Sequence, residues 1–156
     1  MKKIILIIII LFNLNTKIIA SEIFGFATIT DGDTIKISNN RIRLHGIDAP
    51  EKNQKCMKNL TEYSCGITST IALIKKINNN LVRCRVQEKK DRYNRYIGVC
   101  FSKNKNLNKW MVRNGHAIVY RRYSKDYILD EKYAKTNKLG LWSGIFLKPE
   151  KWRKLN

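Results

Sequence analysis

Three short runs rich in apolar and β-branched residues, each followed by a turn, constrain the fold of this chain more than any other feature. They cover residues 23–30, 34–38 and 41–47, with turn-forming sequences at 31–33 and 39–40. Runs of this length bounded by Gly, Asn and Asp are typical of strands. Because such short turns join neighbouring antiparallel strands, the chain is expected to start its domain with a β-meander.

A helix follows the meander. Ile67, Ile71 and Ile74 recur at positions i, i+4 and i+7, a spacing that predicts an α-helix. Three consecutive asparagines at 78–80 interrupt this pattern and predict the end of the helix.

The last third predicts two further helices separated by a strand. The first helix covers 107–114 and is stopped by Gly115, a strand follows at 117–121, and the second helix runs from about 127 to 138, before Gly140. Meandering strands with helices between and after them suit a small barrel. The fold class predicted is therefore α+β, a five-stranded OB-type β-barrel with three α-helices.

The first twenty residues resemble an export signal. Two lysines precede an unbroken apolar run at 4–12, and Ala20 closes the segment. The run is too short for a spanning helix, which needs about 20 residues. We expect a signal peptide at 1–20, a mature domain at 21–156 and a secreted or periplasmic protein. The alternative is an N-terminal membrane anchor, because Ile18 stands where a cleavage site prefers a small residue.

Export allows disulfides, and an even number of cysteines suits a complete set. Strand-like runs at 81–86 and 96–101 flank the turn-like sequence DRYN, which predicts a β-hairpin with Cys84 opposite Cys100. Cys56 and Cys65 then remain as the second pair, although the sequence permits three pairings. A zinc site is the competing interpretation, but the chain has no CxxC motif.

The charge indicates the kind of partner. With 31 Lys and Arg against 12 Asp and Glu, the chain carries a formal charge of +19. Such an excess favours a polyanion, namely nucleic acid, an anionic membrane or a charged glycan. An AT-rich genome also enriches lysine and asparagine, so the charge is supporting evidence only.

The densest chemistry lies in two acidic turns, at 31–34 and 43–51. A short meander between them can bring Asp33 and Asp48 to one rim of the barrel, where carboxylate oxygens suit Ca²⁺ or Mg²⁺. A carboxylate pair, arginines and a glutamate are the groups that phosphate-ester hydrolysis requires. Each turn alone is more often structural, and only their joint order favours a catalytic site.

Three segments, DGDTIKI, RLHGIDAPE and DRYNRYIGVC, resemble the signature sequences of staphylococcal nuclease homologues. The resemblance covers residues 22–156, and YRRYS with GLWSG is similar to the secreted bacterial branch of that family. It implies an OB barrel and a calcium-dependent nuclease that hydrolyses phosphodiester bonds of DNA or RNA and leaves 3′-phosphates. It also implies a monomer with no obligate protein partner.

The resemblance assigns roles position by position. It makes three residues catalytic: Arg43, Glu51 and Arg95. It makes three residues ligands of Ca²⁺: Asp33, Asp48 and, through its backbone carbonyl, Ala49. It makes four residues contacts to the substrate: Arg92, Tyr93, Arg121 and Tyr123.

Three positions depart from the family pattern, and two histidines have no role in it. Ala49 stands where Thr is common, which a carbonyl ligand tolerates. Arg121 replaces an aromatic residue, which favours phosphate contact over base stacking. Asn94 replaces a Gly, and Asn tolerates a left-handed conformation. We interpret His45 and His116 as structural.

Two other functions remain open. A nucleic-acid-binding OB module without turnover would keep the basic surface but lose the metal and arginine positions, which are intact here. A protein held at the membrane by residues 4–12 would present its basic face to anionic lipid.

Overall fold

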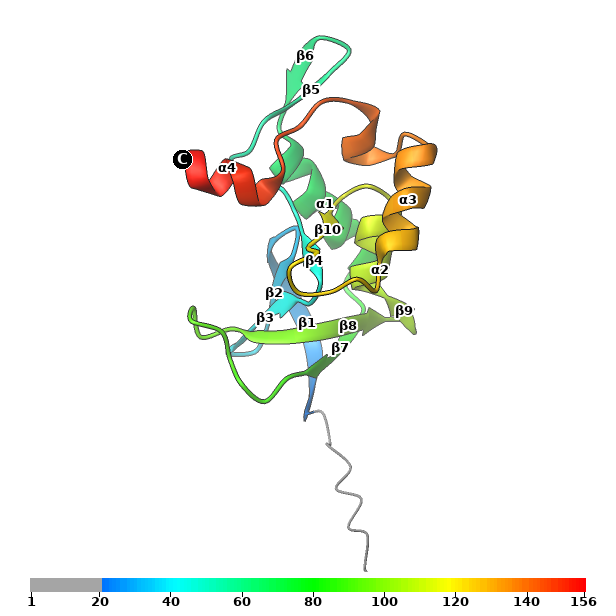
Figure 1. The fold of residues 1–156 in the computed structure, drawn as a ribbon. Coiled ribbons are helices and arrows are strands. Elements are labelled where there is room, and N and C mark those ends of the chain that lie inside the picture. The colour runs from blue at the N-terminus through cyan, green and yellow to red at the C-terminus, as the bar shows by residue number, and fades with distance from the viewer. Residues whose placement is uncertain (1–20) are drawn as a thin grey trace, which may run out of the picture.

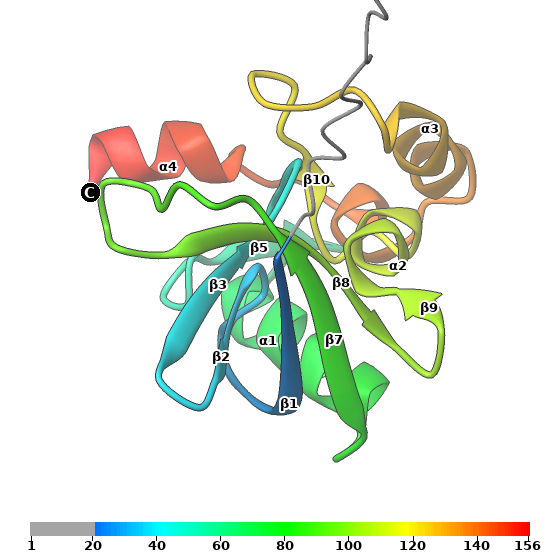
Figure 2. The same cartoon turned by 90° about the horizontal axis from the view of Figure 1, so that it is seen from below.

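The computed structural model describes residues 21–156, and five of its strands close into a barrel (Figures 1 and 2). Antiparallel pairing runs in the order β3-β2-β1-β7-β8, and a parallel pairing between β3 and β8 closes the barrel. A two-residue strand, β9, pairs with the end of β8. The strands are β1 (Ser21–Asp31), β2 (Thr34–Ile37), β3 (Asn40–Leu44), β7 (Leu81–Val86), β8 (Tyr96–Ser102) and β9 (Lys105–Asn106). This confirms the predicted fold class.

The barrel interior is formed by alternate residues of these strands. Ile42, Val82 and Cys84 have no exposed surface, whereas their immediate neighbours along each strand are more exposed. Side chains of a strand alternate between its two faces, so this pattern is expected for a closed sheet with a packed core.

Two short pairings lie outside the barrel. β4 (Ile47–Asp48) pairs with β10 (Ile118–Val119), which places Asp48 opposite Ile118. β5 (Cys56–Lys58) pairs with β6 (Thr61–Tyr63), and this hairpin projects at the top of Figure 1.

Residues 21–156 contain four α-helices, one more than predicted. They are α1 (Cys65–Ile77), α2 (Leu107–Arg113), α3 (Ile128–Thr136) and α4 (Pro149–Leu155). A single 3₁₀ turn, η1 (Gly140–Ser143), precedes α4. The prediction missed α4 because its seven residues show no apolar periodicity. Proline at its first turn is favourable there, since that position has no helical partner for an N–H group.

The helix predicted at 67–77 exists, but its isoleucine stripe does not face the core. Ile67, Ile71 and Ile74 are 45%, 43% and 47% exposed. The buried face instead carries Leu73 and Ile77, and the small residues before them, Gly66, Ser69 and Thr70. Apolar periodicity therefore identified the helix and not its orientation, because small residues allow closer approach to the barrel.

Both predicted disulfides are present. Cys84 and Cys100 are directly opposite on β7 and β8, with their Cα atoms 4.0 Å apart. Cys56 and Cys65 join β5 to the start of α1, with their Cα atoms 5.6 Å apart. No free cysteine remains among residues 21–156, so the zinc interpretation does not apply there.

The predictions of a signal peptide and of a membrane anchor fall on residues 1–20, which lie outside the described residues. Between residues 21 and 156, no helix has the length and apolar character needed to cross a membrane.

Candidate functional site

A hollow of about 1100 Å³ lies at one end of the barrel. The β1–β2 turn, the β3–β4 turn, the loop from β7 to β8 and α4 all contribute to its wall. Figure 2 shows α4 and that loop on the same side of the barrel. Seven Arg and Lys residues line the hollow against five Asp and Glu residues. The hollow therefore offers both carboxylates and an excess of cations.

Asp33, Arg43 and Asp48 form the centre of this site. Arg43 donates from Nη1 to Oδ1 of Asp33 at 2.8 Å and from Nη2 to Oδ1 of Asp48 at 3.0 Å. Thr34 pairs with Arg43 in the β2–β3 register, so the turn before β2 must lie beside the end of β3. Asp33 and Asp48 are 3% and 1% exposed. Local strand pairing thus brings the two predicted carboxylates to one guanidinium.

Backbone groups complete the environment of Asp33. Its Oδ2 accepts a hydrogen bond from the Ala49 N–H at 3.0 Å, and its Oδ1 accepts another from the Thr34 hydroxyl at 3.0 Å. Its own N–H donates to Oδ1 of Asp31 at 3.0 Å, which holds the acidic turn in shape. The Ala49 backbone is therefore in contact with Asp33 through its N–H group, whereas the ligand predicted from the sequence is the Ala49 carbonyl.

Burial and mutual repulsion make this cluster costly to ionise. Burial, with a further contribution from nearby Asp33, raises the pKa of Asp31 to about 6. Burial also raises the pKa of Asp48, although hydrogen bonds from Arg153 oppose the shift. A divalent cation would relieve this repulsion, since it favours the charged forms of both groups.

The oxygen donors at this centre could contribute to a site for a hard divalent cation that takes the rest of its shell from carbonyl and water. Among residues 21–156, no three His, Cys, Asp or Glu side chains converge tightly enough to hold a metal by themselves. Two buried carboxylates and the Ala49 backbone are nevertheless adjacent, and hard oxygen ligands of this kind fit Ca²⁺.

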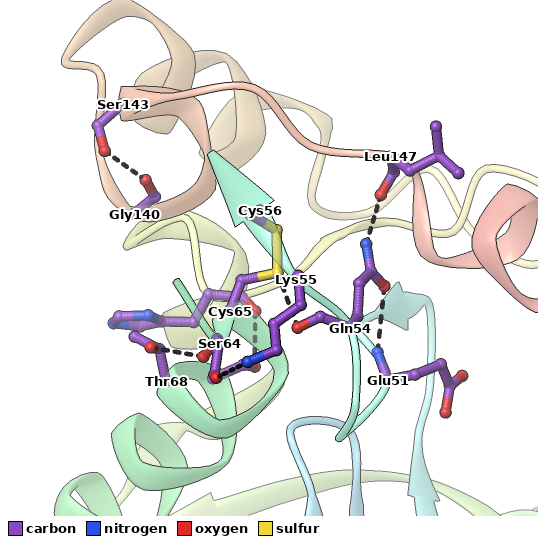
Figure 3. The surroundings of a disulfide bond; sticks show 12 residues. Glu51, Gln54, Lys55, Cys56, Ser64, Cys65, Thr68, Gly140, Ser143 and Leu147 are labelled. Atoms are coloured by element: carbon purple, nitrogen blue, oxygen red, sulfur yellow. Dashed lines mark hydrogen bonds between the residues drawn. A yellow bond between two sulfur atoms is a disulfide. The ribbon is translucent and has the colours of Figure 1, made fainter. Parts of the chain in front are cut away.

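Glu51 lies three residues after Asp48 in the chain and lines the same hollow. Gln54 fixes its backbone: the Glu51 N–H donates to the Gln54 side-chain oxygen at 3.3 Å, and the Gln54 amide donates to the Leu147 carbonyl at 2.7 Å (Figure 3). The Cys56–Cys65 disulfide lies two residues beyond Gln54 (Figure 3). The Glu51 turn is thus tied both to α1 and to the segment before α4.

Arg153 of α4 is a site residue that sequence reasoning missed. Its Nη1 donates to Asp48 at 2.9 Å and to Glu51 at 2.8 Å, and its Nη2 donates to Asp48 at 3.2 Å. Burial lowers its pKa, but the hydrogen bonds to both carboxylates outweigh this and raise it. More than a hundred residues separate Arg153 from these partners, so no local motif could have indicated the contact.

The loop between β7 and β8 supplies Arg92, Tyr93 and Arg95. Asp91 accepts from Nε and Nη2 of Arg95 at 2.9 and 2.7 Å, and Nη1 of Arg95 has no acceptor among residues 21–156. Burial raises the pKa of Asp91, but hydrogen bonds from Arg95 outweigh it and the pKa is lowered. Asn94 has a φ of +59°, which confirms the left-handed conformation predicted for it.

The segment after β10 places Tyr120, Arg122 and Tyr123 in the wall of the hollow, but not Arg121. Arg121 instead forms an ion pair with the buried carboxylate of Glu131 on α3. Gly46 makes the approach of this segment possible, because at its φ of +75° a Cβ atom would lie 2.8 Å from the Ser124 Cβ.

The two histidines differ in position. His45 lines the hollow. His116 packs against Trp110 with ring centroids 5.3 Å apart, and burial lowers its pKa. Its backbone carbonyl accepts from the Ser69 hydroxyl at 2.7 Å, which ties α1 to the start of β10.

Comparison with known proteins connects this geometry to a family. ExoI of Rhizobium meliloti (strain 1021), a succinoglycan biosynthesis protein, is 35% identical over 127 residues, which are 79% of this chain and 66% of that protein. An uncharacterized endonuclease of Escherichia coli O157:H7 is 32% identical over 142 residues, 86% of either chain. A micrococcal nuclease of Shigella flexneri is 33% identical over 145 residues, 81% of this chain and 77% of that protein.

A family model described as staphylococcal nuclease homologue matches residues 41–144. The match includes Arg43, Asp48, Glu51 and Arg95 and covers more than half of the chain. With its closed five-stranded barrel and its nuclease-named relatives, the chain belongs to the family of staphylococcal nuclease homologues.

Proposed function

We propose that this protein is a calcium-dependent nuclease that hydrolyses phosphodiester bonds of DNA or RNA and leaves 3′-phosphates. The observation that carries the proposal is the shared guanidinium of Arg43, which joins two buried carboxylates in a hollow that also contains Glu51 and Arg95. Relatives named as endonucleases or nucleases support the reaction class.

Asp33, Asp48 and the Ala49 carbonyl would hold the calcium ion. When bound, the ion supplies Lewis-acid stabilisation of charge on the phosphoryl oxygens. Arg43 would remain beside these carboxylates and direct its remaining N–H groups to the same phosphate. Its position between Asp33 and Asp48 fixes its orientation before substrate arrives, so little reorganisation is needed.

Glu51 would accept a proton from the attacking water. Its side chain is about one-third exposed at the rim of the hollow, where water can reach it. Arg153 holds this carboxylate in the free protein, and Gln54 holds its backbone. Arg95 would donate from its free Nη1 edge to the scissile phosphate, while Asp91 keeps the other edge in place.

Arg92, Tyr93 and Tyr123 would bind the flanking nucleotides. Tyr93 and Tyr123 are 56% and 61% exposed, and the Arg92 and Arg95 guanidinium groups lie 4.8 and 5.1 Å from the Tyr93 ring. Arg121 would have to leave Glu131 to reach a phosphate. Arg122, which already lines the hollow, is the better placed cation.

One assay tests the reaction and its metal. The purified protein is incubated with single-stranded DNA, double-stranded DNA or RNA, in Ca²⁺, in Mg²⁺ or in excess chelator. We expect cleavage in Ca²⁺, weak cleavage in Mg²⁺ and none in chelator, because a shell of carboxylates, carbonyl and water tolerates the looser geometry of calcium. Full activity in chelator would contradict the proposal.

Two variants separate catalysis from binding. Glu51→Gln is expected to lower the single-turnover rate by about 10²–10⁴-fold, and Arg95→Ala by at least about 10²-fold, with oligonucleotide binding nearly unchanged. Glu62→Gln in the exposed β5–β6 hairpin is the matched control. If both site variants cleave at the parent's saturated rate, a non-catalytic nucleic-acid-binding OB module becomes the better interpretation.

We also propose that the protein acts outside the cytoplasm as a monomer, without an obligate protein partner. The two disulfides suit an oxidising compartment. Fractionation of cells tests this: the protein is expected in the medium or periplasm, and recovery only with membranes would favour the anchored alternative.

A further inference from the structure

The outer face of the barrel carries aromatic side chains that lie outside the catalytic hollow. Phe24 and Phe26 on β1 are 63% and 68% exposed. Phe24 pairs with Arg83 on β7, and Arg83 pairs with Phe101 on β8, so the three form one row across neighbouring strands. We name this surface the aromatic-basic face: Phe24, Phe26, Leu81, Arg83, Phe101 and Lys103.

This face is concave. All six residues line a second hollow of about 470 Å³. β1 and β7 run side by side at the front of Figure 2, and the two phenylalanines of β1 lie on the strand face that points away from the core. Exposed aromatic rings cost free energy in water, so a group of them in a hollow is typical of a surface that binds a flat or apolar ligand group.

The same face is cationic. Arg83 and Arg85 lie with their Cζ atoms 6.0 and 5.5 Å from the Phe101 ring centroid. Glu22 is the acidic partner on this part of the described sheet, at 3.3 Å from Arg85 and 3.9 Å from Arg83. Arg83 and Lys103 of the face, together with the adjacent Arg85, outnumber Glu22. The face therefore retains net positive charge beside its aromatic rings.

A continuous track of side chains connects this face to the catalytic hollow. Ile97 lines the catalytic hollow and Phe101 lines the second one, and both point to the same side of β8 with Val99 between them. On β7, Arg85 likewise lies between Gln87 of the catalytic hollow and Arg83. Strand geometry makes the path from Ile97 to Phe101 about 13 Å long.

We propose that the aromatic-basic face binds a single-stranded stretch of the nucleic-acid substrate outside the cleavage site. The inference rests on the proposed nuclease function. Exposed rings would stack on bases, and the arginines and Lys103 would contact phosphates; this combination binds single strands with little sequence preference. A strand held in the catalytic hollow can continue along β7 and β8 to this face, so long substrates gain contacts that short ones lack.

The test compares Phe24→Ala/Phe26→Ala with Leu129→Ala, which truncates an apolar residue on α3 that is also mostly exposed. A second variant, Arg83→Gln/Lys103→Gln, removes charge and keeps the rings. For a long single-stranded oligonucleotide, we expect both double variants to raise KM at least about fivefold, with kcat unchanged. For a substrate of two or three nucleotides, which fills only the catalytic hollow, we expect no change.

Binding of the long oligonucleotide in chelator, measured by fluorescence anisotropy, should weaken in the same variants. This binding measurement requires no cleavage, so it tests the aromatic-basic face even if the protein proves not to be a nuclease. Unchanged KM and unchanged binding in the phenylalanine variant would overturn the inference. Parent and variants are also sedimented with vesicles of phosphatidylcholine and phosphatidylglycerol. If the parent sediments with the vesicles and the variants do not, while the variants still bind the oligonucleotide, the face binds lipid and the inference is overturned.

Discussion

Arg153 gives the free protein an internal cation where the proposed mechanism places a metal. It bridges Asp48 and Glu51 and carries a positive charge that the folded structure stabilises. A calcium ion beside Asp48 would meet this charge at close range. The contact therefore keeps two acidic groups in place without metal, at a cost in metal affinity.

We expect Arg153→Gln to tighten calcium binding by about five- to tenfold, because it removes a like charge next to the ion in a partly buried site. Calcium titration calorimetry measures the affinity. Lys154→Gln is the matched control, since its more exposed charge pairs with Glu150 at the rim of the hollow. Equal or weaker binding in Arg153→Gln would show that Arg153 supports the ligands more than it competes with the ion.

The sequence indicated that the residues at the centre of the site lie together, but not which residues hold them in place. Asp33, Arg43 and Asp48 are close in the chain and their approach follows from a short meander. Gln54 and Arg153 act through contacts that span 93 and 105 residues, and such contacts depend on how α4 packs. Arg121 was predicted to contact substrate, yet its position beside a buried glutamate depends on α3.

At the scale of elements, Glu131 joins α3 to β10 and the segment after it. Its carboxylate is 1% exposed and accepts from the Val119 N–H at 2.9 Å. Arg121 and Lys135 also pair with it. Burial raises the pKa of Glu131, but the hydrogen bond from Arg121, with those from Val119 and Lys135, outweighs burial and the pKa is lowered.

Glu131→Gln is expected to lower the free energy of unfolding at pH 7 by about 1.5–3 kcal/mol, the usual effect of a hydrogen bond to a charged group. A glutamate has a pKa of about 4.3 in the unfolded chain. When folding lowers this pKa, the carboxylate stabilises the fold at every pH above that value, and the stabilisation is lost as the pH falls through the pKa of the folded protein. Thermal melts of parent and variant should therefore converge in acid. The control Glu88→Gln, at an exposed position, should melt at the same temperature as the parent. A difference in melting temperature between parent and Glu131→Gln that widens in acid would contradict a lowered pKa for Glu131.

Helix prediction shows where sequence patterns are informative at this scale. The run at 67–77 predicted α1, because apolar residues at positions i, i+4 and i+7 favour a helix, whereas a strand would show alternation. Its orientation could not be predicted, since the core accepts small residues beside Leu73 while three isoleucines remain exposed. α4 is too short for periodicity, and its position follows from contacts such as Gln54 with Leu147.

For the molecule as a whole, the Cys56–Cys65 disulfide joins β5 to α1, which the barrel sheet does not connect, and the Cys84–Cys100 disulfide crosslinks two strands that already pair. Complete reduction is expected to lower the free energy of unfolding by about 2–5 kcal/mol, the typical effect of losing a native disulfide in a small secreted domain. Calorimetric melts with and without reductant measure the loss, and peptide mapping without reduction should recover Cys56–Cys65 and Cys84–Cys100. An unchanged melting temperature after all four thiols have been alkylated would refute this.

The parallel seam between β3 and β8 also determines when the site can form. Ile42 pairs with Tyr96 across this seam, so Arg43 on β3 and Arg95, the residue just before β8, lie on its two sides. Contacts between segments so distant in the chain form late, because the entropy of closing the intervening loop is lost before the contact is gained. A chain whose barrel is still open can have its hairpins and helices in place, but its two arginines remain apart. Competence for cleavage should therefore appear with the last cooperative step of folding.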